Sequence, residues 1–464
     1  MKVDVLVAEI GSTTTVVNAF HHIHSENPQF IGQGQATTSV EAGDVRIGLQ
    51  NSIDDLKNNL GVKDLSYDEM FATSSAAGGL KMTVHGLVFD MTARAAKEAA
   101  LGAGAIVRFV TAGKLRRTDL KKIQEINPNI ILLAGGVDYG ERETALENAE
   151  KILDLNLKIP VIYAGNIEND EEIKLIFEGS QQELMVVENV FPKIDELNVE
   201  PTRKVIQKVF ENHIVHAPGM SHVYDMVNET ITPTPASVMN MCKLIYERIG
   251  DVLVIDVGGA TTDVHSVTEG NEAISRIQVA PEPVAKRTVE GDLGMYVNSQ
   301  NVIDIVGKDV LEKEGFNVDT LLANYQFIPR TEEEKRFIVR LTEAATLTAV
   351  YRHAGKLRHV YGPSGRATLA QGKDLTRIQY IIGTGGALTQ LPDGEKILKK
   401  IVQKEKTKDM LLPAGEVTIL MDYQYILASL GVLAYKYEAA ALKLLEGSLN
   451  MTLPVKEALE DEEP

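Results

Sequence analysis

Residues 251–264 read DVLVIDVGGATTDV, and residues 4–17 read DVLVAEIGSTTTVV. Placed over each other without a gap, the two segments are identical at eight positions, beginning with Asp4 and Asp251. At average residue usage, about one identity would be expected by chance over such a stretch. The two copies start 247 residues apart, which is too far for a solenoid repeat and indicates a duplicated domain.

Each copy has the same local pattern. A run of apolar, β-forming residues ends at an acid, which is Glu9 in the first copy and Asp256 in the second, and this indicates a buried strand. A glycine turn, small hydroxyl residues and a second strand follow, so the pattern predicts a β-hairpin. Its tip lacks bulky side chains, so the backbone N–H groups can contact an anion. Two such tips facing each other across a cleft would hold a polyphosphate from both sides.

The two tips predict the residues of a phosphate site. The first loop consists of Gly11, Ser12, Thr13 and Thr14, and the second of Gly258, Gly259, Ala260 and Thr261. We expect Glu9 and Asp256 to hold Mg²⁺ beside the phosphates, mostly through water. For Asp263 two interpretations stay open: it orients the attacking water, or it caps the second strand. The residues expected to act in catalysis are Asp256, Thr261 and Asp263.

A third glycine cluster lies in YIIGTGGAL, residues 380–388. A strand runs into Gly383, Thr384, Gly385 and Gly386, and a helix starts there, so the backbone can approach a flat ring closely. The pattern alone is also typical of an ordinary strand–helix turn. Its position in the second half favours a loop that binds adenosine.

The rest of the chain fits a duplicated domain with an insertion. A βαβαβ rhythm over residues 129–188 predicts a small parallel-sheet module between the repeats. Helices are predicted at residues 90–103, 141–153, 168–177, 237–249, 332–353, 395–404 and 425–446. The expected organisation is a first half over 1–104, an inserted α/β module over 105–200, a return to the first half and hinge over 201–250, a second half over 251–450, and an acidic tail over 451–464.

Composition excludes several classes of function. Lysine and arginine total 47 against 65 acidic residues, a net charge of −18, whereas a nucleic-acid binder needs a positive surface. Cys242 is the single cysteine, so intrachain disulfides and thiolate zinc sites within one chain are excluded, which fits a cytoplasmic protein. The N-terminus runs directly into a strand pattern, so no signal peptide is expected. No apolar run approaches the ~18 residues of a membrane helix.

The motifs EIGSTTT, IDVGGATTD and GTGGA resemble the two phosphate motifs and the adenosine motif of the actin, hexokinase and heat-shock-chaperone ATPase superfamily. The resemblance implies an α/β fold of duplicated actin-like (ribonuclease-H-like) domains around a nucleotide cleft, with ATP and Mg²⁺ as cofactors. It implies that Glu9 and Asp256 lie near Mg²⁺ and Thr261 near the γ-phosphate. The first motif normally opens with aspartate, and Glu9 is one methylene longer.

Over nearly its full length the chain is similar to the GlmL family, also labelled MutL in clostridial amino-acid fermentation operons. The stretches that carry this similarity are VLVAEIGSTTT, ATSSAAGGLKM, ILLAGGVDYGE, IDVGGATTDVHSV, KRTVEGDLGM and YIIGTGGALT. The family is associated with adenosylcobalamin-dependent mutases such as glutamate mutase and ornithine aminomutase. The resemblance therefore implies an ATP-binding and ATP-hydrolysing chaperone that reactivates such an aminomutase, with mutase subunits as partners.

Two other functions stay open from the sequence. A small-molecule kinase would use the same cleft and would turn over ATP rapidly only with its substrate. An actin-like assembly or scaffold protein would bind ATP and act by polymerising. The inserted module is the natural candidate for gripping a partner, since it has no role in holding the nucleotide. The sequence leaves open which mutase is the client and whether the chain forms a homo- or hetero-oligomer.

Overall fold

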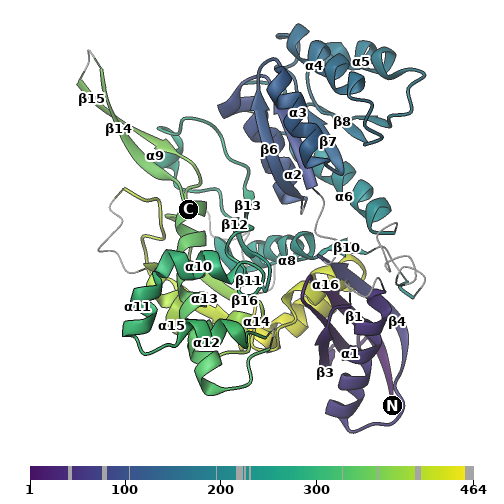
Figure 1. Ribbon diagram of the computed structural model, residues 1–464, viewed down its shortest axis with the longest axis vertical. Helices are drawn as coiled ribbons and strands as arrows, with labels where there is room; N and C mark the ends of the chain where they lie inside the picture. Colours follow the sequence, from purple (N-terminus) through teal and green to yellow (C-terminus); the bar gives the residue numbers. More distant parts are fainter. Residues whose placement is uncertain are drawn as a thin grey trace. The chain divides into compact units, whose positions relative to one another are not determined.

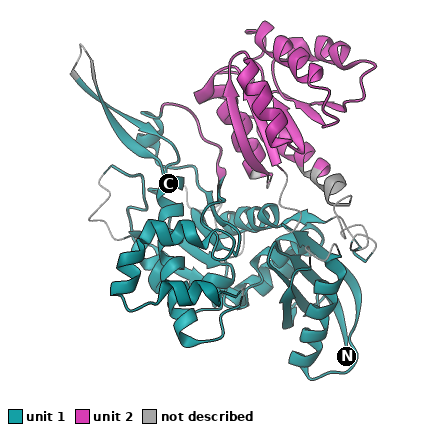
Figure 2. Ribbon diagram, in the orientation of Figure 1, with its two compact units in different colours: residues 1–76, 218–278, 287–464 teal, residues 77–217, 279–286 magenta. Residues whose placement is uncertain are grey.

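The computed structural model describes residues 1–39, 44–75, 81–103, 105–194, 196–215, 223, 226–228, 231–326, 328–362, 365–402 and 409–454. Part of the ATSSAAGGLKM stretch, the end of the helix predicted at 395–404 and most of the expected acidic tail lie outside these residues. The chain forms two compact units (Figure 2): unit 1 contains residues 1–76, 218–278 and 287–464, and unit 2 contains residues 77–217 and 279–286.

Unit 1 contains two five-stranded sheets of the same topology. The first has the order β3-β2-β1-β4-β10 and the second the order β13-β12-β11-β16-β17. In each sheet an antiparallel hairpin (β1–β2, β11–β12) has a parallel strand beside its first member. Unit 1 is therefore a duplicated actin-like α/β fold, as the sequence predicts. The strands are β1 (Lys2–Ile10), β2 (Thr14–His21), β3 (Gln29–Thr37), β4 (Ser66–Ser74), β10 (Thr232–Pro233), β11 (Val252–Val257), β12 (Thr262–Val267), β13 (Ala285–Glu290), β16 (Tyr380–Thr384) and β17 (Thr418–Met421).

The two hairpins match residue for residue. Ile10 pairs with Thr15 in the first, and Val257 pairs with Thr262 in the second. Each turn is closed by one backbone hydrogen bond, from Gly11 N to Thr14 O at 2.9 Å and from Gly258 N to Thr261 O at 3.0 Å. Residues that align in the sequence repeat therefore occupy the same positions in the two hairpins. Both predicted hairpins are confirmed.

Helices cover the sheets of unit 1. A capping box of Thr331 and Glu334 starts a long helix of the second half, whose predicted bounds of 332–353 are confirmed. Two other helices cross at Gly431, where an added Cβ would lie 1.9 Å from the carbonyl oxygen of Ser237, so the crossing requires glycine. The helices are α1 (Val45–Leu60), α8 (Thr234–Ile249), α9 (Glu272–Ser275), α10 (Ser299–Val306), α11 (Lys308–Lys313), α12 (Val318–Ala323), α13 (Glu332–His353), α14 (Gly386–Thr389), α15 (Gly394–Lys399) and α16 (Leu427–Leu449).

A separate two-stranded hairpin, β14 (Lys356–Gly362) with β15 (Gly365–Gln371), extends from unit 1 (Figure 1). Within the described ranges, no helix has the length and apolar character that crossing a bilayer requires.

Unit 2 is built on one parallel sheet of order β6-β5-β7-β8-β9. Its strands are β5 (Lys81–Gly86), β6 (Ile106–Ala112), β7 (Ile130–Leu133), β8 (Val161–Tyr163) and β9 (Leu184–Val186). Its helices are α2 (Arg94–Gly102), which follows a π-helical turn at Phe89–Ala93, α3 (Arg117–Ile126), α4 (Glu143–Asp154), α5 (Asp170–Phe177) and α6 (Glu200–Val215). Apolar residues of α3, α4 and α5 share one core with β7 and β8.

Unit 2 starts earlier in the chain than residue 105, where the sequence placed the inserted module. The reason is β5, which pairs with both β6 and β7 inside the sheet. The sequence pattern around β7, β8 and β9 predicts strands locally. That β5 belongs to the same sheet follows only from its pairing with β6 and β7, which lie farther along the chain. Residues 279–286 also belong to unit 2.

Candidate functional site

One cavity of unit 1 lies against both hairpin tips. Thr13 and Thr14 line it from the first tip, and Val257, Gly258 and Gly259 line it from the second. The tips approach so closely that a Cβ added at Gly259 would lie 2.6 Å from Oγ1 of Thr13. Glycine is therefore the residue that lets the two halves bring their tips together.

The carbonyl groups of the first tip are bonded to the protein. The hydroxyl of Thr38 donates to Gly11 O at 2.8 Å, and the N–H of Thr38 donates to Thr13 O at 3.0 Å. The amide N–H groups of Ser12 and Thr13 have no acceptor among the residues that the structure describes. Backbone donors rarely stay without a partner, so the first tip offers hydrogen bonds to an anion.

The second tip has the same polarity. The N–H groups of Met295 and Tyr296 donate to Gly258 O at 3.1 Å and to Gly259 O at 2.7 Å. Over the described part of the chain, the N–H groups of Gly259 and Ala260 have no acceptor. Each half of unit 1 therefore contributes a tip whose carbonyls are satisfied by the protein and whose N–H groups remain available.

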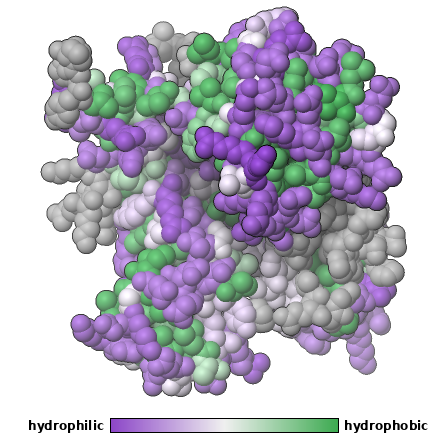
Figure 3. Space-filling view, turned by 45° about the horizontal axis from the view of Figure 1, so that its top comes forward, coloured by the Kyte–Doolittle hydropathy of each residue, from purple (hydrophilic) through white to green (hydrophobic). Residues whose placement is uncertain are grey.

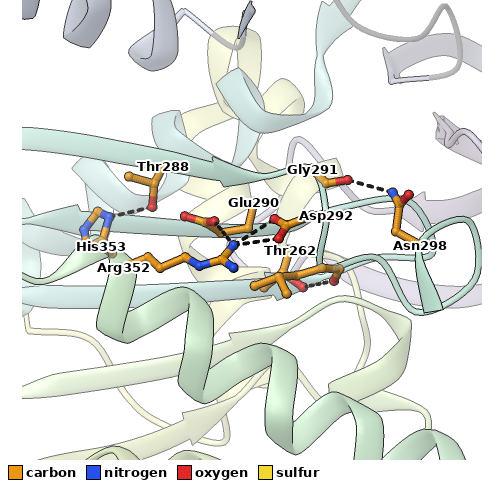
Figure 4. A network of polar contacts seen from close by, with 9 residues as sticks. Thr262, Thr288, Glu290, Gly291, Asp292, Asn298, Arg352 and His353 are labelled. Carbon is orange, nitrogen blue, oxygen red and sulfur yellow. Dashed lines mark hydrogen bonds and ion pairs between the residues drawn. The ribbon is translucent and has the colours of Figure 1, made fainter. Parts of the chain in front are cut away.

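A polar network fixes the segment that holds the second tip (Figure 4). Nη1 of Arg352 donates to Glu290 and Asp292, each at 2.8 Å. Nδ2 of Asn298 donates to Gly291 O at 2.6 Å. It also donates to Ala260 O at 3.2 Å, which ties the tip itself to the segment. The network therefore holds the second tip in one geometry.

Asp263 binds two partners beside the second tip. Its Oδ2 accepts a hydrogen bond from Thr261 at 3.1 Å, and its Oδ1 accepts one from Arg287 at 2.8 Å. The side chains of Asp263 and Arg287 are 8% and 2% exposed, so the ion pair is buried. The carboxylate of Asp263 therefore contacts Thr261 and Arg287 at the same time, and each of its oxygens keeps a second acceptor site.

Asp256 lies one residue before the end of β11, next to the second tip. Burial and the nearby charge of Asp263 raise the pKa of its carboxyl to about 7, although Arg287 opposes the change. The third glycine cluster backs onto this side chain, because a Cβ at Gly385 would lie 2.5 Å from Oδ1 of Asp256. Gly385 also has a φ of 85°, which favours glycine. Asp256 and the third cluster are therefore packed as one structure.

Glu9, the corresponding acid of the first half, is held differently. Its Oε1 accepts hydrogen bonds from the N–H of Ser429 at 3.0 Å, from the Ser429 hydroxyl, and from Nδ2 of Asn18 at 3.3 Å. Burial raises the pKa of Glu9 to about 8; Ser429 opposes the shift, whereas Asp422 and Asp256 add to it. Oε1 is thus tied to the first turn of α16, and Oε2 has no hydrogen-bond partner among the described residues.

Within the third glycine cluster the four residues have different surroundings. Gly386 lines the cavity, whereas the hydroxyl of Thr384 donates to the buried carboxylate of Asp422 at 2.9 Å. Burial raises the pKa of Asp422. Gly383 is packed against Leu398 and Met421. Asp422 was not predicted from the sequence, although it directly follows an apolar strand, β17, much as Glu9 and Asp256 lie near the ends of theirs.

Two stacked rings and a mixture of apolar and polar side chains line the rest of the cavity. The rings of Tyr296 and Tyr325 are stacked, with centroids 5.6 Å apart and planes 8° apart. The hydroxyl of Tyr325 donates to Met295 O at 2.5 Å. Further lining residues are Gln326, Ile328, Pro329, Lys335, Ile338, Ala387, Gln390, Leu391 and Tyr425. No periodicity in the sequence connects these residues, so sequence reasoning missed them.

Asp256 and Glu9 are the acids near the tips that could hold a metal ion. No group of three or more His, Cys, Asp and Glu side chains suited to a metal ion occurs in the described ranges. Mg²⁺ does not need such a group, because it keeps several waters and takes one or two carboxylates together with substrate phosphates. Asp256 and Oε2 of Glu9 fit that requirement.

The family model described as "MutL protein" matches residues 5–449. The chain belongs to the MutL protein family. Protein MutL of Clostridium tetanomorphum is 35% identical to this MutL-family chain over 457 residues, which cover 95% of the chain and 98% of the relative.

Solved structures match the chain with low sequence identity. A nucleotide-free acetone carboxylase has a TM-score of 0.40 and 12% identity, with 93% of this chain and 70% of that chain covered. Component A of (R)-2-hydroxyglutaryl-CoA dehydratase from Acidaminococcus fermentans has a TM-score of 0.30 and 10% identity, with 95% and 99% covered. A glycerol dehydratase reactivase has a TM-score of 0.29 and 9% identity, with 93% and 99% covered.

Proposed function

We propose that this MutL-family protein binds ATP between the two hairpin tips and hydrolyses it while reactivating an adenosylcobalamin-dependent aminomutase of the glutamate or ornithine type. The observation that supports nucleotide binding most strongly is the pair of tips, one from each half, with available N–H groups at one cavity. The accessory role is supported by membership of the MutL family and by the resemblance of the motifs to that family. The mutase is the expected partner.

In this proposal the triphosphate lies at the tips and the adenine lies against the stacked rings of the cavity. Tyr296 and Tyr325 provide an apolar wall for it, and Gly386 lines the same cavity. The cavity measures about 250 Å³. Ligand sites typically measure about 300–1,000 Å³, so a nucleotide would fill this space and extend beyond its mouth.

Asp256 and Oε2 of Glu9 would hold Mg²⁺, at least partly through water. The ion would supply positive charge to the phosphates and stabilise the charge of the leaving group. A bound cation also favours the ionised form of Asp256, whose pKa is raised to about 7 in this structure. Asp263 would keep Thr261 at the phosphates, while Arg287 balances the buried charge of Asp263.

ATP bridging both tips would favour a closed arrangement of the two halves, and hydrolysis would release it. A ligand shifts such an equilibrium only through its different affinities for the two states. A nearly complete switch requires a difference of about 5.5 kcal/mol. The many hydrogen bonds that two opposed tips can make to one triphosphate are a suitable source of that difference.

Isothermal titration calorimetry with ATP and Mg²⁺ tests nucleotide binding. Gly386→Val places a side chain in the cavity, and no protein atom lies within 4 Å of an added Cβ, so the fold should tolerate it. We expect the affinity for ATP to fall at least about tenfold. Gly415→Val is the matched control, because its Cβ also meets open space but the residue does not line the cavity. Equal ATP affinity in the two variants would contradict the proposed site.

A second assay tests the accessory role. Inactivated glutamate mutase and ornithine aminomutase are each incubated with the protein, ATP, Mg²⁺ and fresh adenosylcobalamin. We expect mutase activity to return in at least one case, and only when a hydrolysable nucleotide is present. A protein that binds ATP but restores neither mutase would refute the proposed role and leave the nucleotide site standing.

A further inference from the structure

Three loops at one edge of the unit 2 sheet are tied together by side chains. They follow β7, β8 and β9, so they lie at the carboxyl ends of parallel strands, where open α/β sheets bind their ligands. Asp138 accepts hydrogen bonds from the N–H of Ile167 at 3.0 Å and from Nδ2 of Asn189 at 2.9 Å. Oδ1 of Asn166 accepts one from the N–H of Tyr139 at 3.0 Å. Each loop is thus bonded to at least one of the others.

Glycines allow the same loops to interlock without space between them. A Cβ added at Gly165 would lie 2.3 Å from the backbone nitrogen of Gly135. A Cβ added at Gly136 would lie 2.8 Å from the carbonyl oxygen of Glu141. Because the backbones touch directly and are cross-bonded, this edge of unit 2 is rigid, and any side chain that it carries is held in place before a partner arrives.

Two large apolar side chains stand on this rigid edge. Tyr139 is 78% exposed and Ile167 is 52% exposed. Their backbones are neighbours. The N–H of Tyr139 donates to Asn166, which precedes Ile167, and the N–H of Ile167 donates to Asp138, which precedes Tyr139. Tyr139 also has a φ of 61°, a left-handed conformation that is uncommon for a residue with a Cβ. Backbone strain of this kind clusters at functional sites.

We call Tyr139 and Ile167 the platform. Carboxylates surround it, since acidic residues flank both side chains and occupy the first turns of α4 and α5. The exposed acids are Glu141, Glu143, Glu168, Glu171 and Glu172. Two basic side chains lie among them. Arg142 donates to Oδ1 of Asn169 and to Glu168 O, and Lys174 pairs with Glu171 at 2.7 Å. The platform is therefore an apolar centre with an acidic rim. Figure 3 shows apolar patches bordered by hydrophilic residues on one face of the molecule.

We propose that the platform anchors a protein partner whose surface has an apolar pocket edged by lysine and arginine. Rigid, exposed aromatic and aliphatic side chains inside a polar rim are typical of the residues that dominate protein interfaces. The acidic rim repels nucleic-acid phosphates and anionic lipid headgroups, so a protein fits this surface better than either. The inference rests on the proposed function in one respect: the partner is the aminomutase.

Surface plasmon resonance with immobilised glutamate mutase or ornithine aminomutase tests the platform. Tyr139→Asn removes the ring and keeps a residue that tolerates the left-handed backbone, and Ile167→Ser removes the second anchor. We expect the double variant to bind the mutase at least about tenfold more weakly than the wild type. Leu175→Ser is the control, because Leu175 is 60% exposed on α5 and carries no part of the platform. Glu168→Lys should weaken binding less, and only at low salt.

The outcomes separate the platform from the proposed function. Unchanged ATP affinity in the double variant shows that unit 1 is intact. If the wild type binds a mutase and the double variant binds it equally well, the platform is refuted and the proposed function survives. If the wild type binds neither mutase, the proposed client falls, and the partner assigned to the platform falls with it. Binding of a single-stranded RNA by the wild type, abolished in the double variant, would overturn the assignment to a protein.

Discussion

The two hairpin tips of unit 1 have the same backbone but different chemistry. Their strand registers and turn hydrogen bonds are equivalent. In the first tip, however, the acid at the strand end is tied to α16 through Ser429. In the second, the acid lies beside the Asp263–Arg287 ion pair, whereas Val16 occupies the position that corresponds to Asp263. The comparison teaches that the duplication kept the anion-binding backbone and changed the residues around it.

The largest expected effect comes from removing the cation that pairs with Asp263 beside the second tip. Arg287→Met leaves the carboxylate of Asp263 buried without its cation, which typically costs about 3–5 kcal/mol. Chemical denaturation should show that the unfolding free energy of the variant is lower than that of the wild type by this amount. Arg352→Met is the comparison, because Arg352 is 41% exposed and its pairs lie nearer the surface, so its loss should be clearly smaller. Equal losses of unfolding free energy in the two variants would mean that burial does not make the Asp263–Arg287 pair more important for stability.

The next experiment sharpens the difference between the two acids. Asp256→Asn should slow Mg²⁺-dependent ATP hydrolysis by about 10²-fold, the size typical of removing one group that stabilises developing charge. Glu9→Gln should have a smaller effect, because an amide can keep a contact with Ser429 and the pKa of Glu9 is already raised to about 8. Hydrolysis rates at several Mg²⁺ concentrations provide the measurement. A larger loss for Glu9→Gln would reverse the assignment of the two roles.

A smaller effect is expected where the two tips meet. Gly259→Ala brings a Cβ within 2.6 Å of Oγ1 of Thr13, and such overpacking costs about 1–3 kcal/mol. Thr13→Ala removes that oxygen and should restore part of the loss in the double variant. The unfolding free energies of the two single variants and the double variant form a thermodynamic cycle. If the losses of unfolding free energy in the two single variants simply add in the double variant, the tips do not touch in solution.

The effect of pH is the smallest one when it is taken per pH unit. The folded pKa of Glu9 is raised from its ordinary value near 4.5 to about 8, so the folded state binds more protons than the unfolded state between these values. The unfolding free energy should therefore fall as pH rises from about 4.5 to 8, by at most about 1.4 kcal/mol per pH unit for this proton. Glu9→Gln should flatten the pH dependence in this window. Identical curves for the variant and the wild type would contradict the burial of Glu9.

Much of the fold was predictable because its signals are local. Apolar runs, glycine turns and a capping box occupy a few consecutive residues, so both hairpins and the bounds of α13 could be predicted from sequence. The start of unit 2 could not, since β5 joins its sheet through pairing on both sides with strands farther along the chain. The stacked tyrosines at the cavity were missed for a related reason, because Tyr296 and Tyr325 come from different segments with no shared period.

The amino-acid sequence by itself determined that two equivalent strand–turn–strand tips exist and that an acid ends the first strand of each, because neighbouring residues specify both features. Only the tertiary structure decided what each acid does. Glu9 receives its hydrogen bonds from Ser429, 420 residues away, and Asp256 acquires its raised pKa from burial and from Asp263. A side chain's charge state depends on what surrounds it in space, and that environment exists only once distant segments have packed.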